Sequence, residues 1–312
     1  MRLCVIIVNY RTPGLVLDAL ESLAGQLEVG QDQVVIVDNG SGDDSAARIE
    51  QAIGARGFSR ICRVIRSPRN LGFSAGNNLA IRTIDAQYYL LLNSDTIVRE
   101  RAIATLLNEM DHHLGVGIGG PRLESLAGKA QVSCFRDYSP MSEFLIASDS
   151  ESPHRWFEPF DIALPISDEP IEPDWISFAC AIIRHDVIDK IGLLDEGYFM
   201  FFEDSDYCRA ARAAGFRIRY FPKARVVHLL GGTAPDVKTL PPSSGRAPRY
   251  FYQSRARYFR KGYGVAGVVA ANALWQLGRS VSFGRELIGR KAPHASKKEW
   301  LDNWTDTFKL QR

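Results

Sequence analysis

Three small oxygen-bearing side chains follow a short apolar segment in the N-terminal third of the chain. Tyr88 to Leu92 are apolar, which predicts a buried strand, and Asn93, Ser94 and Asp95 come directly after them. In an open α/β sheet, ligands bind outside the carboxyl ends of the strands. A carboxylate with amide and hydroxyl neighbours suits a hard divalent cation that also holds phosphate oxygens, although the same residue types commonly form turns.

Polar segments of the same kind follow three other apolar segments, at residues 3–8, 34–37 and 61–65. Each of them, taken alone, is more readily interpreted as a surface turn. Four such segments, each directly after a predicted strand, would meet at one edge of a parallel sheet and form one polar cleft. The three further segments are Asn9-Tyr10-Arg11, Asp38-Asn39-Gly40-Ser41 and Arg69-Asn70-Leu71-Gly72.

Two of these segments have groups suited to a nucleotide. Asp38 can accept hydrogen bonds from a base or a ribose hydroxyl, as acidic residues do in nucleotide sites. Gly72 and Gly76 would let backbone N–H groups approach a diphosphate at the start of the following helix. A nucleotide is therefore a candidate ligand of the cleft.

Three acidic residues, Glu203, Asp204 and Asp206, follow the apolar segment 199–202. Burial at the mouth of such a segment can raise the pKa of a carboxylate toward that of a useful general base. One of the three could then deprotonate a hydroxyl that attacks a sugar carbon. The alternative is helix capping, with Asp204 at the N-cap position and Asp206 in the first turn, where it favours the helix dipole.

His228 ends another apolar segment and precedes two glycines, Gly231 and Gly232. A lone histidine in such a place is more often a packed or capping residue than a ligand. With a metal expected at Asp95, a second metal ligand from a distant strand becomes a reasonable hypothesis. The other histidines have no such neighbours, and no role is assigned to them.

The order of the predicted elements indicates the fold class. Apolar segments predict strands at residues 3–8, 34–37, 61–65, 88–92, 175–183, 218–221 and 225–228. Amphipathic segments predict helices near residues 13–23, 45–53, 72–84, 102–110, 185–191 and 204–214. The alternation predicts an α/β fold with a doubly wound, mainly parallel sheet. Residues 137–173 are rich in proline, acid and serine, which predicts a mobile loop or cover.

A nicotinamide-dependent oxidoreductase is disfavoured as the function. The glycine-rich segment 115–120 superficially resembles a dinucleotide-binding fingerprint, but Pro121 follows it in place of a helix. Residues 9–14, after the first predicted strand, do not form a phosphate-binding glycine turn either.

Composition is that of an ordinary globular protein, with 46% hydrophobic and 24% charged residues and a net charge of +2 in 312 residues. This charge gives no global attraction to nucleic acid. The five cysteines are scattered and form no Cys-x-x-Cys pair, which disfavours a disulfide framework or a structural zinc site. With no predicted signal sequence or transmembrane helix, we expect a cytoplasmic location.

The motifs together resemble the inverting glycosyltransferases of family 2, most closely a rhamnosyltransferase-like branch. The resemblance covers roughly residues 3–233, and the order and spacing of the motifs are specific. It implies a Rossmann-like domain of the GT-A type over residues 1–240, a nucleotide-sugar donor (dTDP- or UDP-sugar) and Mg²⁺ or Mn²⁺. The matching segments are residues 5–10, 37–41, 70–78, 91–95 and 194–206, with His228.

The resemblance also implies roles for individual residues. Asp204 would be the catalytic base, with Glu203 as the next candidate, and Asp95 would hold the metal with His228 as a second contact. Asp38 would bind the base or ribose of the donor. The donor-binding set as a whole would be Asn9, Tyr10, Asp38, Asn39, Asn70, Gly72, Asn77 and Ser94.

Two positions depart from the usual family pattern. Asn93 opens the metal triplet in place of an aspartate, as in the rhamnosyltransferase branch, and leaves fewer charged ligands. Phe178 stands where a glycine is common, which changes the pocket expected on the acceptor side.

Residues 241–312 differ in composition and are expected to form a helical extension. Basic residues and aromatic rings surround a charge-free run at residues 262–278. This pattern suits an interfacial element on an anionic membrane surface, here through residues 246–291, and so a peripheral position on the inner face of the cytoplasmic membrane. A helix packed on the domain is nearly as good an interpretation, and no fold-level feature supports nucleic acid.

The leading hypothesis is therefore a metal-dependent inverting glycosyltransferase. It would move a sugar, with rhamnose from dTDP-rhamnose as a candidate, to a hydroxyl of a cell-envelope glycan or a polyprenyl-linked acceptor. The alternative is a non-catalytic module that binds nucleotide sugars, which would not need acids at 203–206.

Overall fold

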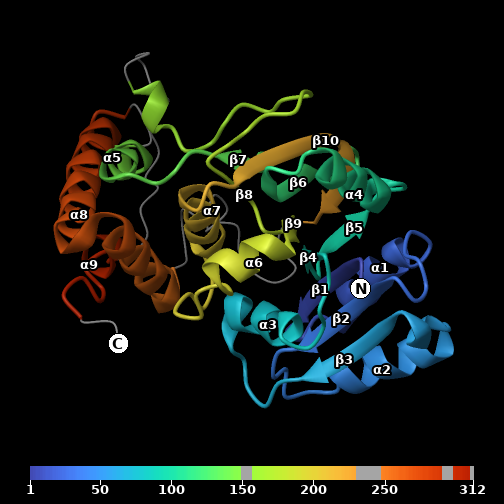
Figure 1. Ribbon diagram of the computed structural model, residues 1–312. Helices are drawn as coiled ribbons and strands as arrows, with labels where there is room; N and C mark the ends of the chain where they lie inside the picture. The colour runs from blue at the N-terminus through green and yellow to red at the C-terminus, as the bar shows by residue number, and fades with distance from the viewer. Residues whose placement is uncertain (149–156, 230–246, 290–297, 310–312) are drawn as a thin grey trace.

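The computed structural model describes residues 1–148, 157–229, 247–289 and 298–309. Its centre is one mixed sheet of eight strands in the order β3-β2-β1-β4-β9-β6-β10-β5, seen from one side in Figure 1. The predicted α/β class with a mainly parallel sheet is confirmed. Gly231, Gly232 and the start of the predicted extension lie outside the described residues.

The first half of the sheet is parallel and matches the expected alternation of strands and helices. Its strands are almost wholly apolar because helices cover both faces. The strands are β1 (Leu3–Asn9), β2 (Asp32–Asp38), β3 (Cys62–Arg66) and β4 (Tyr88–Asn93). The connecting helices are α1 (Pro13–Ala24), α2 (Ser45–Ala55), the short 3₁₀ helix η1 (Phe58–Arg60) and α3 (Gly72–Ile81).

The second half of the sheet is mixed. Strand β9 (Cys180–Arg184) runs antiparallel to both β4 and β6 (Val116–Glu124), while β10 (Arg217–His228) is parallel to β6. The edge strand β5 (Thr96–Val98) runs antiparallel to β10.

Two strand boundaries expected from the sequence are wrong. The strand expected at 175–183 is divided, because β8 (Trp175–Ile176) pairs with β7 (Cys134–Phe135) in a separate two-stranded sheet before the chain enters β9. The two strands expected at 218–221 and 225–228 are one strand, β10, whose register with β6 shifts between Phe221 and Arg225.

Alternate side chains of the strands enter two cores on opposite faces of the sheet. Leu3, Val5 and Ile7 pack with α1, α2 and α4 (Ala102–His112). Cys4 and Ile6 face the other core, with α3, α6 (His185–Ile191) and α7 (Glu203–Ala213). Figure 1 shows these two helix groups on opposite sides of the sheet.

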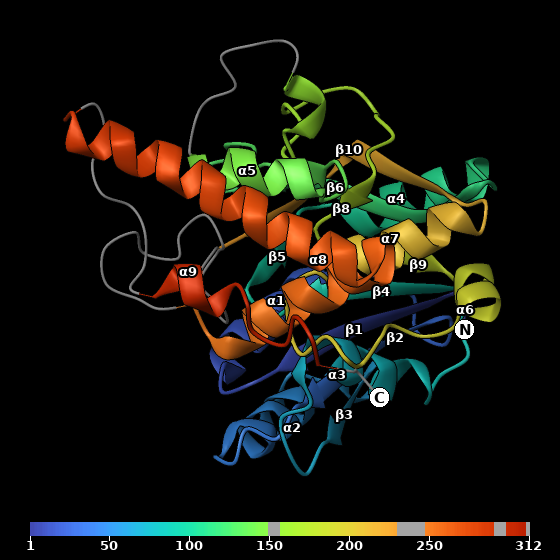
Figure 2. The ribbon, with the colours of Figure 1, turned by 90° about the vertical axis from the view of Figure 1, so that its left-hand side faces the viewer.

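A third layer, formed by the C-terminal helices, lies outside α7. Helix α8 (Arg249–Leu287) packs along α5 (Pro140–Ser148), and the short α9 (Glu299–Asp302) lies next to α8 (Figure 2). The expectation of a loop at 137–173 is therefore wrong in part, because α5 and a 3₁₀ turn, η2 (Glu158–Phe160), lie there. The helical geometry of α8 is interrupted at Gly264, which has φ 68° and ψ −171°.

No helix in the part of the chain that the structure describes has the length and hydropathy needed to cross a membrane. All five cysteines are buried as free thiols. Burial raises the pKa of Cys4, Cys62 and Cys134 to about 12, and that of Cys180 and Cys208 further still.

Candidate active site

The carboxyl ends of β1 and β2 meet side by side, as expected from the sequence. Asn9 lies opposite Asp38 in the strand register, and its Nδ2 donates a hydrogen bond of 2.7 Å to Asp38 Oδ1. Ser41 Oγ donates to the same oxygen at 2.5 Å. The second carboxylate oxygen, Oδ2, is not used in these bonds and remains a candidate acceptor for a ligand hydroxyl.

A second set of contacts shapes the loop before α3. Asn39 Nδ2 donates to Asn70 Oδ1 at 3.1 Å and to the Gly72 carbonyl at 3.0 Å. Gly72 has φ +81°, and a Cβ atom there would lie 2.2 Å from the carbonyl oxygen of Phe199. Only glycine fits this close approach, which brings the start of α3 against the loop that precedes the acids.

The remaining donor-site candidates differ in accessibility. Tyr10 is exposed at the end of β1, with the Arg11 guanidinium 5.1 Å from its ring centre. Ser94 Oγ lies 3.2 Å from Thr12 Oγ1. Asn77, in contrast, is buried within α3 and donates to the Phe73 carbonyl, so its amide nitrogen supports the helix.

Asp95, between β4 and β5, and His228, at the end of β10, lie next to each other, as expected for a shared metal. His228 Nε2 lies 3.5 Å from Asp95 Oδ1, and the Asp95 carbonyl accepts a hydrogen bond from Leu229 N. Neighbouring ligands of an octahedral Mg²⁺ are about 3 Å apart, so these two atoms fit one ion. Among the described residues, no group of three or more His, Cys, Asp or Glu side chains is placed for a metal. Asp95 and His228 would thus be the ligands among the described residues, with other positions open to diphosphate and water oxygens.

The acids 203 and 204 lie in the first turn of α7. The N-cap position is occupied by Phe202, without a side-chain cap, so the alternative interpretation of Asp204 as the N-cap is wrong. Instead, Asp204 Oδ1 accepts a hydrogen bond of 2.8 Å from Ser205 N. Burial raises the pKa of Asp204 to about 6, and hydrogen bonds from the backbone of Ser205 and Phe178 limit the rise. This pKa suits a general base near neutral pH.

Glu203 has a different environment from its neighbour. It is buried, and its Oε2 has no hydrogen-bond partner among the described residues. Burial, together with the charge of Asp204, raises the pKa of Glu203 well above its ordinary value. Burial and the neighbouring charge thus disfavour the charged form of Glu203, and Asp204 is the better candidate to accept a proton.

Phe178, which stands where the family commonly has glycine, is buried in the core. Its ring makes an edge contact with Tyr207 of α7, with the ring centres 6.3 Å apart. The residue takes part in the site through its backbone, which donates to Asp204.

Sequence reasoning named Asp206 among the candidate acids but did not predict the ion pairs that surround this segment. Asp195 and Asp206 form ion pairs with Arg257 and Lys261 of α8. The signal available in the sequence was the spacing of four between the two cations, which places them on one face of a helix.

The sequence matches the family described as "Glycosyl transferase family 2" over residues 4–192. The chain belongs to glycosyltransferase family 2. The match covers the strands and loops with the candidate donor-binding residues and ends before the acids 203–206 and His228.

Two curated relatives have names that state a reaction. The low-salt glycan biosynthesis hexosyltransferase Agl10 of Haloferax volcanii is 26% identical over 232 residues, 72% of this chain and 66% of Agl10. The N-acetylglucosaminyl-diphospho-decaprenol L-rhamnosyltransferase of Mycobacterium tuberculosis is 36% identical over 62 residues, 20% of either chain. The matches span 66% and 20% of the length of these two relatives, less than two thirds in each case.

Solved structures share the fold. TarS 1–349 of S. aureus in complex with UDP-GlcNAc has a TM-score of 0.56 at 16% identity, covering 98% of this chain and 80% of TarS. The mannosyltransferase PcManGT of Pyrobaculum calidifontis, in complex with GDP-Man and Mn²⁺, has a TM-score of 0.53 at 14% identity, with 94% and 81% covered. This family 2 chain therefore has the α/β GT-A fold that the resemblance implied.

Proposed function

We propose that this protein is an inverting glycosyltransferase in which Asp204 is the base that activates the acceptor hydroxyl. The observation that carries the proposal is the environment of the Asp204 carboxyl group. Burial there raises its pKa to about 6. Asp204 follows a loop that contacts the proposed donor side directly. Phe73 N, at the start of α3, donates a hydrogen bond of 2.7 Å to the carbonyl oxygen of Phe199 in this loop. Donor-side and acceptor-side groups therefore lie on adjoining segments.

In this proposal, one set of residues binds the donor and its leaving group, and another activates the nucleophile. Asp38 would hold the ribose or base of the donor, with Asn9 fixing its orientation. Asp95 and His228 would hold Mg²⁺ or Mn²⁺, which when bound neutralises charge on the departing diphosphate. Asp204 would take the proton of the acceptor hydroxyl as that oxygen attacks the anomeric carbon from the face opposite the departing nucleoside diphosphate.

For the sugar and its acceptor, we propose rhamnose from dTDP-rhamnose and a hydroxyl of a polyprenyl-linked or cell-envelope glycan. The support is the M. tuberculosis relative, whose name states both a rhamnosyl group and an N-acetylglucosaminyl-diphospho-decaprenol. A donor panel tests this choice, with UDP-sugars and GDP-mannose as the competing donors.

The decisive experiment measures nucleoside diphosphate release from such a panel with Mn²⁺ or Mg²⁺, for wild type, Asp204→Asn and Glu203→Gln. We expect turnover of one donor to fall roughly 10²- to 10⁴-fold in Asp204→Asn while donor binding persists. Glu203→Gln is the matched control, because glutamine resembles a protonated glutamate, and it should keep most of the activity. Chelation of the metal should stop turnover in both active proteins.

The opposite outcome favours a second function. If wild type and both variants bind donor equally, and none turns it over with acceptor extracts present, the protein is a nucleotide-sugar binding module. Loss of activity in Glu203→Gln but not in Asp204→Asn would instead exchange the roles of the two carboxyl groups.

We further propose that the second half of α8 rests on an anionic membrane surface. From Val265 to Ile288, ten residues are exposed and none of them is charged. Several follow helical spacing along one line, namely Ala266, Ala273, Leu277, Val281, Gly284 and Ile288. The Trp300 carbonyl of α9 accepts a hydrogen bond from Gln276, so the exposed rings of Trp300 and Trp304 adjoin this face.

Charge complementarity favours anionic lipid as the partner of this face. Residues 246–312 contain fourteen Lys and Arg residues but only four Asp and Glu residues. Residues 1–245 contain twenty-four Lys and Arg residues and thirty-two Asp and Glu residues. An uncharged helical face within a basic segment is typical of helices that lie in the interface of anionic membranes.

Sedimentation with vesicles tests this surface. Wild type should pellet with phosphatidylcholine vesicles that contain phosphatidylglycerol, and Leu277→Glu should lose most of this binding. Leu114→Glu, an exposed leucine next to α4 on the other side of the sheet, is the control and should bind as wild type does. Failure of wild type to pellet, or a dimer in solution that Leu277→Glu dissociates, would contradict the membrane proposal.

A further inference from the structure

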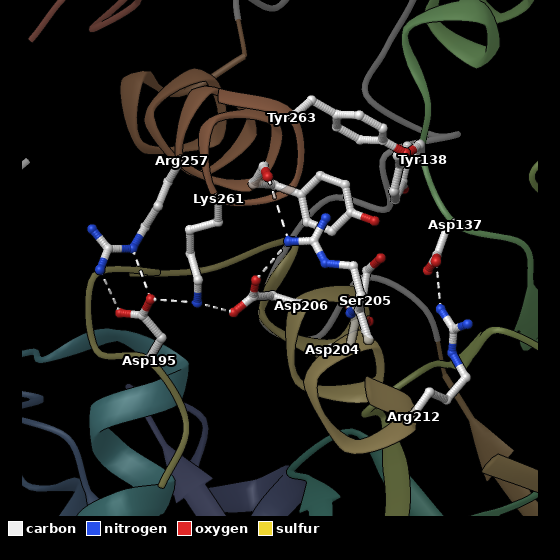
Figure 3. A network of polar contacts seen from close by, with 12 residues as sticks. Asp137, Tyr138, Asp195, Asp204, Ser205, Asp206, Arg212, Arg257, Lys261 and Tyr263 are labelled. Carbon is white, nitrogen blue, oxygen red and sulfur yellow. Dashed lines mark hydrogen bonds and ion pairs between the residues drawn. The ribbon is translucent and has the colours of Figure 1, made fainter. Parts of the chain in front are cut away.

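Helix α8 forms a chain of ion pairs with the segment that contains the acids (Figure 3). Arg257 donates to both carboxylate oxygens of Asp195, at 2.7 and 3.0 Å. Lys261, one turn further along α8, donates to the same carboxylate at 2.9 Å and to Asp206 at 2.5 Å. Asp195 precedes and Asp206 follows the proposed base in the sequence, so the two cations hold the segment on both sides of it.

The two carboxylates of these ion pairs are shielded from water, with the Asp195 side chain 22% and the Asp206 side chain 7% exposed, whereas Lys261 is 41% exposed. Burial alone would raise the pKa of Asp195, yet hydrogen bonds from Arg257 and Lys261 lower it to about 2. The Asp206 side chain is 7% exposed and also pairs with Arg209. Lys261 is the member that joins the two carboxylates.

Aromatic packing from α8 holds the same segment in a strained conformation. Phe201 and Phe202, directly before the acids, both have positive φ, at 71° and 66°. Such a conformation costs about 1–3 kcal/mol for each non-glycine residue and persists only where the surroundings enforce it. The Phe202 ring lies 5.6 Å from that of Tyr258 and 5.7 Å from that of Phe251, both on α8.

The segment is anchored on its opposite side to α3. Glu196 accepts hydrogen bonds from Asn78 at 3.0 Å and from Arg82 at 2.7 Å. Because α3 begins at the donor-side glycine Gly72, the acids lie on a segment held between the donor side and α8.

We propose that Lys261 and Arg257 are positioning residues for the transfer reaction, because they hold the segment that contains Asp204 in place next to α3. The C-terminal helix, which lies outside the residues matched to the family, is then part of the active site. This inference rests on the proposed function, since it takes Asp204 as the base.

The test compares Lys261→Met, Lys261→Arg and Arg279→Met, with donor concentration varied at saturating metal. Lys261→Met should lower kcat roughly ten- to hundredfold, because misplacing a catalytic group by about 1 Å has effects of that size. The donor KM should stay within about twofold, since the proposed donor contacts come from β1, β2 and α3. Lys261→Arg should restore most of kcat. Arg279 pairs with Glu286 elsewhere on α8, so Arg279→Met removes a cation from the helix without affecting kcat.

Thermal unfolding of each variant shows that it is folded at the assay temperature. A folded Lys261→Met protein with the kcat of wild type would overturn the inference. So would equal losses in kcat and donor affinity without rescue by arginine, which would indicate general disorder of the site. If Asp204→Asn remains active, the base assignment fails. If Asp204→Asn is inactive while Lys261→Met is fully active, the positioning role alone fails.

Discussion

Glu203 and Asp204 are adjacent acids with different surroundings, and this difference assigns their protonation states. The Asp204 carboxylate accepts hydrogen bonds from the backbone of Ser205 and Phe178, whereas Glu203 is stabilised by its own backbone N–H alone and its Oε2 has no partner among the described residues. Burial disfavours the charged form of both, but a hydrogen bond to the charged form favours it. The backbone around α7 therefore selects Asp204 as the group that ionises first.

The pH dependence of turnover should report the ionisation of Asp204. A base acts in its deprotonated form, so kcat should rise with pH through about 6 and become level above that value. Rate profiles for donor turnover from pH 5 to 8 would measure this limb. Glu203→Gln should move the limb to lower pH only slightly, because a protonated Glu203 contributes little charge. A profile that is flat down to pH 5 would contradict the assignment.

At the scale of elements, the junction between the donor loop and the acid loop depends on one glycine. Gly72→Ala should destabilise the protein by about 1–3 kcal/mol, because the new methyl group would strike the Phe199 carbonyl in a backbone region that alanine disfavours. Turnover should fall with it, since the acid loop would move.

Gly42 provides the control for this prediction. It also has positive φ, at +69°, but a Cβ atom there meets nothing within 4 Å. Gly42→Ala should therefore cost only the conformational strain, about 1 kcal/mol. Urea unfolding and donor turnover of the two variants measure the difference, and equal losses would show that the Phe199 contact is unimportant.

Local patterns were sufficient to predict the donor side of the fold. The apolar segments ending at Asn9, Asp38 and Asn93 became strands β1, β2 and β4, and their polar ends met at one edge. Such strands are predictable because burial on both faces requires a continuous apolar run.

The remaining features depend on contacts between distant segments, which no local pattern contains. Helix α5 was missed because its apolar face is defined by α8, more than a hundred residues later. The split between β8 and β9 follows from the pairing of Trp175 with Phe135. The ion pairs of Lys261 join α8, the loop at Asp195 and helix α7. A local sequence pattern covers only one of these segments at a time.

At the scale of the whole molecule, a buried ion pair connects α5 and α8 in the third layer. Arg255 donates to Glu143 Oε2 through Nε and Nη2, at 3.0 and 2.9 Å, and to Asn272 at 2.6 Å. Both charged side chains are nearly inaccessible to water, at 3% and 5% exposure. Removal of one partner would leave the other charge buried without compensation.

Arg255→Met should therefore destabilise the protein by about 3–5 kcal/mol, whereas the double variant Arg255→Met, Glu143→Leu should recover much of the loss. Urea unfolding, followed by circular dichroism, would give both values. Arg56→Met, which breaks an exposed ion pair with Glu21, should change the free energy of unfolding by less than about 1 kcal/mol. A single variant no less stable than the double one would show that the charges are not coupled.

The buried cysteines can report local unfolding of the elements that contain them. A thiol alkylates through its thiolate, and burial keeps that form scarce at Cys4 in β1, Cys180 in β9 and Cys208 in α7. Reaction at each position must then await exposure of the element that contains it. Mass spectrometry after pulses of iodoacetamide would thus time the release of α7, which contains the acids, separately from that of the central strands.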